Sequence, residues 1–191
     1  DMDLITALIS RDLLNKKRNK GSKIIYDLRS SWVERETIKN EGGKAVETRV
    51  GHSFIKKRMK NSRAIFAGET SGHYYFRDFY NCENSILAAL IVFNNLKRNS
   101  FSEVMSEFRK YYKSDEINFE VKDPDKKIKE IKREYSQGKI SKKDGIKIEF
   151  EEWWFNLRKS NTEDLLRLNL EAKTRKLRDE KVKELKRLIN D

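Results

Sequence analysis

Short apolar strands alternate with helices along the first 112 residues, and this order constrains the fold more than any other feature of the chain. The strands are predicted at 23–28, 45–49 and 64–67. The helices are predicted at 2–18, 32–40, 54–60, 84–96 and 101–112. Such alternation is typical of an α/β layer with at least partly parallel pairing. We therefore expect residues 1–112 to form an α/β domain with a mixed sheet and flanking helices.

The pattern changes near residue 113, where short alternating strands become the main signal. Strands are predicted at 117–121, 145–150, 153–157 and 165–170. Helices are predicted at 125–136 and 174–189. Short strands joined by polar turns favour antiparallel pairing. We expect a linker at 113–116, followed by a small α+β domain at 117–191 with an antiparallel sheet and two helices.

Polar side chains follow each predicted strand of the first domain. Arg29, His52 and Glu69 fall in these loops. The carboxyl ends of parallel strands meet at one edge of a sheet, and ligands commonly bind there. These three residues are therefore candidates for one binding site.

The segment 68–73 reads GETSGH, in which two glycines enclose an acid and two hydroxyl groups. Glycines let a backbone turn sharply and approach a ligand closely. On such a turn, Glu69 and Ser71 can together bind vicinal sugar hydroxyls, and His73 can exchange a proton near neutral pH. The alternative is a plain tight turn with a solvated acid and a capping serine.

The segment 158–162 reads RKSNT, which places a guanidinium, two hydroxyls and an amide in one short predicted loop. Arginine binds phosphate through paired hydrogen bonds, and hydroxyls with loop N–H groups can complete an anion site. The alternative is a polar turn between two strands, because these residue types favour turns in any case.

The chain is basic, with a formal net charge of +12. Basic proteins often bind nucleic acid, anionic membranes or phosphorylated small molecules. Much of the charge lies at 15–23, 122–143 and 173–187, and the last two segments mix both signs, which is typical of solvated helix faces. A basic nucleic-acid-binding module remains the alternative function, suggested by residues 56–58 and 175–187, although the sequence has no recognised nucleic-acid motif.

Cys82 is the single cysteine, so an internal disulfide framework and a Cys/His metal cluster are both excluded. This usage fits a reducing compartment, and we expect a cytoplasmic protein. No apolar run reaches the roughly 20 residues that span a bilayer, and the N-terminus does not read as a signal peptide. Because the chain begins abruptly in a helical pattern, we expect it to be part of something longer.

Four segments resemble the α-D-phosphohexomutases, the phosphomannomutase/phosphoglucomutase family, and they occur in family order. Residues 68–73 resemble the family's sugar-binding loop. Residues 158–163 resemble its phosphate-binding loop and are followed, as there, by 165–168. Residues 26–29 and 49–53 resemble two further segments. The resemblance covers essentially the whole chain and corresponds to the third and fourth of the family's four domains.

The resemblance implies roles for individual residues. Glu69 and Ser71 would bind ring hydroxyls, and His73 would be a candidate general acid/base near the reacting hydroxyl. Arg29 and His52 would line the third-domain side of the site and help to neutralise phosphate. The phosphate that is not transferred would be held by Arg158, Ser160, Asn161 and Thr162.

The resemblance also implies what this chain lacks. The family's phosphoserine and its aspartate-rich Mg²⁺ loop belong to the first two domains, and neither motif is found here. We therefore expect no bound metal and no activity alone, with the N-terminal domains of the parent enzyme as partners. The parent would interconvert hexose 1-phosphate and hexose 6-phosphate. We expect a monomer that binds neither nucleic acid nor membrane, and a pure scaffold role remains a further alternative.

Two positions in the predicted phosphate loop bear on the substrate. Asp164 stands where many relatives have proline, so a nearby carboxylate should slightly weaken anion binding and the loop should be less rigid. Asn161, rather than glycine, favours glucose or mannose phosphates over glucosamine phosphates.

Overall fold

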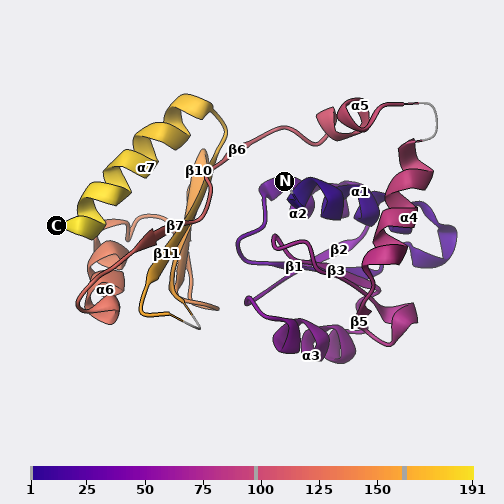
Figure 1. The fold of residues 1–191 in the computed structure, drawn as a ribbon, viewed down its shortest axis with the longest axis horizontal. Helices are drawn as coiled ribbons and strands as arrows, with labels where there is room; N and C mark the ends of the chain where they lie inside the picture. Colours follow the sequence, from indigo (N-terminus) through magenta and orange to yellow (C-terminus); the bar gives the residue numbers. More distant parts are fainter. Residues whose placement is uncertain (1, 97–98, 161–162) are drawn as a thin grey trace. The chain divides into compact units, whose positions relative to one another are not determined.

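The computed structural model describes residues 2–96, 99–160 and 163–191, which form two compact units. Unit 1 comprises Asp1–Lys110 and unit 2 comprises Tyr111–Asp191 (Figure 1). The division therefore falls between Lys110 and Tyr111, two residues before the predicted end of the first domain. Each unit is described by itself.

Unit 1 is built on a mixed sheet with the strand order β2-β1-β3-β4-β5. Its strands are β1 (Lys23–Asp27), β2 (Lys44–Thr48), β3 (Phe66–Gly68), β4 (Tyr74–Phe76) and β5 (Cys82–Glu83). The first three pair in parallel, whereas β4 and β5 are antiparallel. The register pairs Asp27 with Thr48 and Tyr26 with Gly68, so the three parallel strands end at the same edge. The predicted mixed sheet is confirmed.

Helices cover both faces of this sheet (Figure 1). They are α1 (Met2–Asn15), α2 (Trp32–Asn40), α3 (His52–Ser62), α4 (Ser85–Leu96) and α5 (Phe101–Ser106), with short 3₁₀ turns at Lys17–Asn19 and Arg77–Phe79. Alternate residues of β1 explain this arrangement, because they point to opposite faces. Ile24 packs with Ile9 of α1 and Ile38 of α2, whereas Ile25 packs with Ile55 and Met59 of α3.

The helix predicted at 101–112 is shorter than expected. A capping box on Ser100 and Glu103 starts α5, but the helix ends at Ser106. Tyr112 and Lys113 instead form strand β6, which pairs with β11 in unit 2. Pairing with a distant strand therefore overrides the local helical pattern, and the prediction for the end of this helix was wrong.

Unit 2 is an antiparallel sheet with the order β6-β11-β10-β9-β8, and β7 also pairs with β11. Its strands are β6 (Tyr112–Lys113), β7 (Ile117–Phe119), β8 (Lys139–Ser141), β9 (Ile146–Glu149), β10 (Trp153–Lys159) and β11 (Leu166–Ala172). Helices α6 (Pro124–Glu134) and α7 (Arg175–Asn190) complete it. Ile131 of α6 and Leu185 of α7 join one core with the sheet residues Phe155 and Leu168. The predicted α+β architecture is confirmed.

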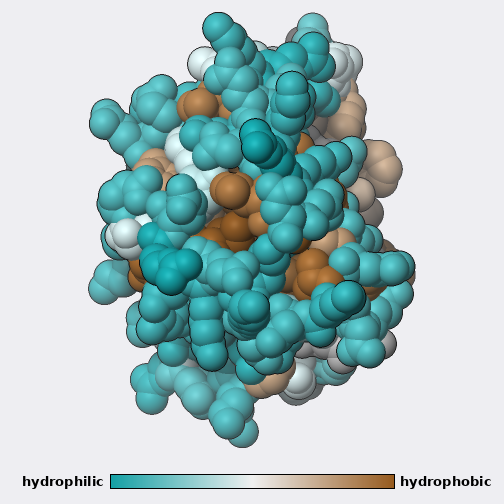
Figure 2. All heavy atoms as spheres, turned by 90° about the vertical axis from the view of Figure 1, so that its left-hand side faces the viewer, coloured by the Kyte–Doolittle hydropathy of each residue, from teal (hydrophilic) through white to brown (hydrophobic). Residues whose placement is uncertain are grey.

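The side of Figure 1 that carries α6 and α7 is mostly hydrophilic, with hydrophobic residues showing between the charged ones (Figure 2). Lysines on these helices pair with neighbouring acids, as Lys127 does with Glu130 and Lys181 with Glu184. Part of the alternating charge on these helices is thus matched along the helix itself. Among the described residues, none of the helices combines the length and apolar character needed to cross a membrane.

Candidate functional site

The segment 68–73 forms the turn that joins β3 to the antiparallel strand β4. The turn is closed by two backbone hydrogen bonds, from Glu69 N to His73 O at 3.0 Å and from Gly72 N to Glu69 O at 2.9 Å. Gly72 has a φ of +87°, which favours glycine. Glycine is favoured at position 68 for a different reason: a Cβ there would lie 2.3 Å from Thr6 Oγ1 in α1. Close packing of α1 therefore shapes the start of the turn.

Glu69, Ser71 and His73 lie together in this turn. The Ser71 hydroxyl donates to Glu69 Oε2 at 2.9 Å and lies 2.9 Å from His73 Nδ1. A hydroxyl has one proton, so while Ser71 donates to Glu69 it accepts from His73 Nδ1–H. The Tyr75 hydroxyl donates to the other Glu69 oxygen at 3.2 Å. Burial, together with the Glu69 charge, raises the pKa of Tyr75, so Tyr75 remains a donor.

Asp27, at the end of β1, ties this turn to the neighbouring loop. It is fully buried and accepts hydrogen bonds from the Thr70 backbone N–H at 3.0 Å and the Thr70 hydroxyl at 3.2 Å. Arg29 donates to it through Nε at 3.1 Å and Nη2 at 2.8 Å. Burial alone would raise the pKa of Asp27, but the Arg29 charge and these hydrogen bonds outweigh it and lower that pKa. Asp27 is therefore a buried anion.

Sequence reasoning missed Asp27, although the spacing Asp-x-Arg at the end of a strand is a usable signal. The family resemblance implied that Arg29 lines the site and helps to neutralise phosphate. In the structure the Arg29 side chain is 11% exposed and forks onto Asp27, so its charge is already matched. His52 is exposed and begins α3 directly after Gly51, the N-cap residue, beyond the end of β2.

The predicted turn at 158–164 begins later than expected, because β10 continues to Lys159. Arg158 is thus a strand residue whose side chain is only 2% exposed, and its Nη2 donates to Glu116 Oε2 at 3.1 Å. Buried arginines need a charged partner, and Glu116 supplies it. Gly145 makes room here, because a Cβ would lie 2.2 Å from Leu157 O and 2.6 Å from Arg158 Cα. Sequence reasoning identified neither Glu116 nor Gly145.

Ser160 begins the connection between β10 and β11. Its backbone N–H donates to Leu165 O at 2.8 Å, and its hydroxyl accepts from Glu163 N at 3.2 Å. The predicted residues Asn161 and Thr162 lie outside the described residues. Ser160 therefore has a defined place at the base of the β10–β11 loop, directly after the strand that carries Arg158.

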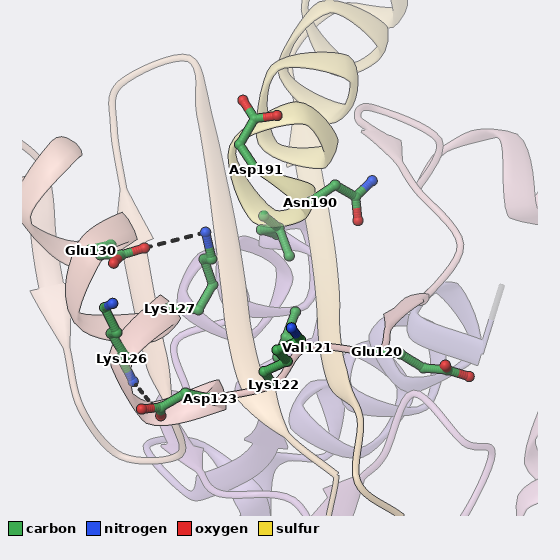
Figure 3. Close-up of a pocket in the computed structure, with 10 residues that line it drawn as sticks. Glu120, Val121, Lys122, Asp123, Lys126, Lys127, Glu130, Asn190 and Asp191 are labelled. Carbon is green, nitrogen blue, oxygen red and sulfur yellow. Dashed lines mark hydrogen bonds and ion pairs between the residues drawn. The ribbon is translucent and has the colours of Figure 1, made fainter.

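A hollow of about 550 Å³ lies in another part of unit 2, beside α6 and the end of α7 (Figure 3). Acidic and basic side chains both line it, and two of them are already engaged: Lys127 contacts Glu130 at 3.2 Å and donates to Leu188 O at 3.2 Å. Mixed and paired charges give no preference for an anion. Within the described ranges, no three His, Cys, Asp or Glu side chains are grouped so that they could hold a metal.

Comparison with known families identifies the chain. The model for phosphoglucomutase/phosphomannomutase, alpha/beta/alpha domain III, matches residues 1–112, and that for the phosphoglucomutase/phosphomannomutase C-terminal domain matches residues 116–188. The chain therefore belongs to the phosphoglucomutase/phosphomannomutase family.

Individual relatives agree with this assignment. A phosphomannomutase of Methanocaldococcus jannaschii is 46% identical over 189 residues, which are 98% of this chain and 42% of that protein. A phosphomannomutase of Vibrio cholerae is 41% identical over 192 residues, covering 97% of this chain and 41% of that protein. The chain thus spans about two fifths of the length of these relatives.

The fold is shared with solved structures. A phosphoglucomutase/phosphomannomutase family protein of Burkholderia thailandensis superposes with a TM-score of 0.85 at 23% identity, over 98% of this chain and 41% of that one. A phosphomannomutase from Thermus thermophilus, described as putative, gives a TM-score of 0.71 at 16% identity, over 100% of this chain and 41% of that one. At this identity the likeness concerns the fold alone.

Proposed function

We propose that this chain is the part of a phosphohexomutase that holds the sugar and the non-transferred phosphate, in a parent enzyme that interconverts hexose 1-phosphate and hexose 6-phosphate. The observation that supports this most directly is the Glu69–Ser71–His73 cluster at the carboxyl edge of the sheet. Family membership and the phosphomannomutase names of the relatives point to glucose or mannose phosphates.

The sugar-binding role rests on the acceptors that the turn presents. Each Glu69 oxygen already accepts one hydrogen bond from the protein, which fixes the carboxylate and leaves lone pairs for substrate hydroxyls. Glu69 is 4% exposed, so a ligand would reach it through a small opening rather than from open solvent. A fixed acceptor costs little reorganisation when a hydroxyl binds.

His73 is the group in this turn best placed to move a proton. Its side chain is 47% exposed, while Nδ1 is held by Ser71. The Nε2 atom would therefore exchange a proton with the reacting hydroxyl. His52 and Arg29 would add positive potential at the same edge, with Arg29 weakened by its pairing to Asp27.

The phosphate-binding role falls to unit 2, through Arg158, Ser160, Asn161 and Thr162. Hydrogen bonds from arginine and hydroxyl groups to a phosphate dianion are charge-assisted and strong. The phosphoryl donor and Mg²⁺ would come from other domains of the longer parent protein, with which this chain would assemble. The free thiol of Cys82 fits a cytoplasmic setting.

A titration followed by amide NMR tests this function. Mannose 6-phosphate should shift amides at 68–73 and 158–160 in the wild-type chain, whereas unphosphorylated mannose should produce much weaker shifts. Glu69→Gln should reduce the shifts at the sugar turn, with exposed Glu103→Gln as the matched control. An absence of shifts at millimolar ligand would rule out binding by the isolated chain. The purified chain should show no mutase turnover.

A further inference from the structure

Two consecutive tyrosines on β4 point to opposite faces of the sheet in unit 1. Tyr74 belongs to the buried cluster on the side of α1, together with Ile9. Tyr75 belongs to the buried cluster on the side of α3, together with Ile55 and Met59. Both residues are almost entirely buried, at 6% and 1% exposure. Their hydroxyl groups therefore need partners inside the protein, and those partners differ.

The Tyr75 hydroxyl finds its partner in the turn at 68–73. It donates to Glu69 Oε1 at 3.2 Å, whereas the Tyr74 hydroxyl donates to the Met2 sulfur at 3.5 Å. The antiparallel register of β3 and β4 places Tyr75 opposite Ala67, two residues before Glu69. The hydrogen bond from Tyr75 thus joins a buried strand of the sheet to the turn.

Two hydroxyl groups of different character hold the Glu69 carboxylate. Ser71 donates to Oε2 at 2.9 Å, but Ser71 is exposed and its oxygen also lies 2.9 Å from His73 Nδ1. A serine hydroxyl can rotate its single proton from one acceptor to the other. The Tyr75 phenol keeps its proton, because burial and the Glu69 charge raise its pKa, and its ring is held in the core. Tyr75 is therefore the permanent support of the carboxylate, and Ser71 the adjustable one.

The packing of Tyr75 also involves α3. This helix begins at His52, and its residues Ile55 and Met59 share a buried cluster with Tyr75. Because protein cores are close-packed, a shift of α3 is transmitted to the side chains packed against it. The positions of His52 and Glu69, two candidate substrate-binding residues, thus depend on one buried cluster.

We propose that Tyr75 is a positioning residue for sugar recognition, which holds the Glu69 carboxylate in the orientation that accepts substrate hydroxyls. This inference rests on the proposed function, which assigns Glu69 to the sugar. A carboxylate anchored at both oxygens keeps its remaining lone pairs in a fixed plane, so a hydroxyl binds with little reorganisation. Tyr75 belongs to unit 1 and the proposed phosphate site to unit 2, so the effect of Tyr75 concerns the sugar and not the phosphate.

Phenylalanine in place of each tyrosine gives a matched pair of variants. Tyr75→Phe should weaken mannose 6-phosphate binding roughly three- to tenfold, the scale of one hydrogen bond. Tyr74→Phe removes a hydroxyl from the neighbouring residue and should leave this affinity unchanged. Inorganic phosphate should bind equally to both variants and to the wild-type chain. Equal affinities of the two variants for mannose 6-phosphate would refute the role of Tyr75, and so would an equal loss of inorganic phosphate binding by Tyr75→Phe.

A double-mutant cycle shows whether Tyr75 acts through Glu69. Glu69→Ala removes both carboxylate oxygens, so adding Tyr75→Phe to it should leave the remaining mannose 6-phosphate affinity unchanged. The ¹³C signal of the Glu69 carboxyl group gives a direct readout of the hydrogen bond. It should move in Tyr75→Phe and stay in place in Tyr74→Phe. A full effect of Tyr75→Phe in the Glu69→Ala background, or an unmoved carboxyl signal, would overturn the inference.

The wild-type chain provides a test that does not depend on the variants, whose folding is checked by thermal unfolding. The ¹³Cζ signal of Tyr75 should move as mannose 6-phosphate saturates the amide shifts at 68–73, with the Tyr74 signal as internal control. Amide shifts without movement at Tyr75 would overturn this inference and leave the proposed function intact. If the amides themselves do not shift at millimolar ligand, the proposed sugar site of the isolated chain fails, and this inference fails with it.

Discussion

The turn at 68–73 in unit 1 and the region around Arg158 in unit 2 present charges of opposite sign. In unit 1, Asp27 and Arg29 neutralise each other, so Glu69 remains as the net charge and the turn offers hydrogen-bond acceptors. In unit 2, Arg158 and Arg167 share Glu116, so the region offers donors. Acceptors suit the hydroxyls of a sugar and donors suit a phosphate. We therefore expect the ion pair of unit 1 to support the architecture of its turn, and the arginine cluster of unit 2 to take part in binding.

The largest expected effect comes from removing the architectural ion pair. Asp27→Asn leaves the nearly buried Arg29 guanidinium without its counter-charge, and breaking a buried pair costs about 3–5 kcal/mol. Urea unfolding should show this loss of stability. Asp78→Asn breaks the exposed pair with Arg77 and should change stability by less than about 1 kcal/mol. Similar values for the two variants would contradict the architectural role of Asp27.

The Asp27 carboxylate should make the free energy of unfolding depend on pH. Its pKa is lowered in the folded protein, so its stabilising effect is complete above the unfolded pKa of about 4 and disappears as pH falls through the folded value. The difference in unfolding free energy between the wild-type chain and Asp27→Asn should therefore shrink below about pH 4. A difference that stays constant down to pH 2 would show that Asp27 does not titrate in this range.

Arg158→Ala should act on binding rather than on architecture. Phosphate affinity should fall by roughly 1.5–3 kcal/mol, the scale of a hydrogen bond to a charged group. The stability cost should be smaller than for Asp27→Asn, because Glu116 keeps Arg167 and Asn169 as partners. Calorimetric titration with mannose 6-phosphate measures the affinity, and Lys159→Ala, an exposed neighbour, is the matched control. Unchanged affinity would remove Arg158 from the site.

Gly68→Ala tests how tightly α1 constrains the sugar turn. The new methyl group would clash with Thr6, and overpacking of this kind costs about 1–3 kcal/mol. Thr6→Ala in the same chain should restore part of the stability, because two of the three clashing atoms are removed. Gly72→Ala strains the backbone instead, so the Thr6 change should not rescue it. Equal rescue of both glycine variants would count against a local clash.

Ser71→Ala has the smallest expected effect. It removes the hydroxyl that links Glu69 to His73, a change of about 0.5–1.5 kcal/mol in sugar-phosphate affinity. Stability should hardly change, because Ser71 is exposed. The distant Ser62→Ala is the control for loss of an exposed hydroxyl. A loss of affinity as large as that of Arg158→Ala would contradict the proposed difference between the two loops.

The longer elements were readable in the sequence, and so were the short strands β3 and β7, whereas four other short strands were not. The helix at Trp32–Asn40 was predicted with its observed bounds, and β10 and β11 with small errors at their ends. Strands β4, β5, β6 and β8 were missed because two or three residues contain too little periodicity to be recognised. Their formation depends on a partner strand that local sequence does not specify.

The turn at 68–73 lies where the sequence predicted it, but the residues that support it were not predicted. The two glycines, together with an acid, two hydroxyl residues and a histidine, indicated a turn at 68–73. Asp27 and Tyr75, which hold it in place, sit in strands whose side chains looked like ordinary strand residues. In unit 2, Glu116 was missed because its arginine partners lie 42 and 51 positions away in the sequence.

The sequence by itself determined the order of elements, the fold class and the two candidate loops, because these depend on local periodicity and on residue types close together in the chain. Tertiary structure alone decided which charges are paired. It places Asp27 against Arg29 and Thr70, and it sets Arg158 opposite Arg167 through the register of two strands. Ion pairing depends on distances of a few ångströms between distant segments, and only the folded chain defines those distances.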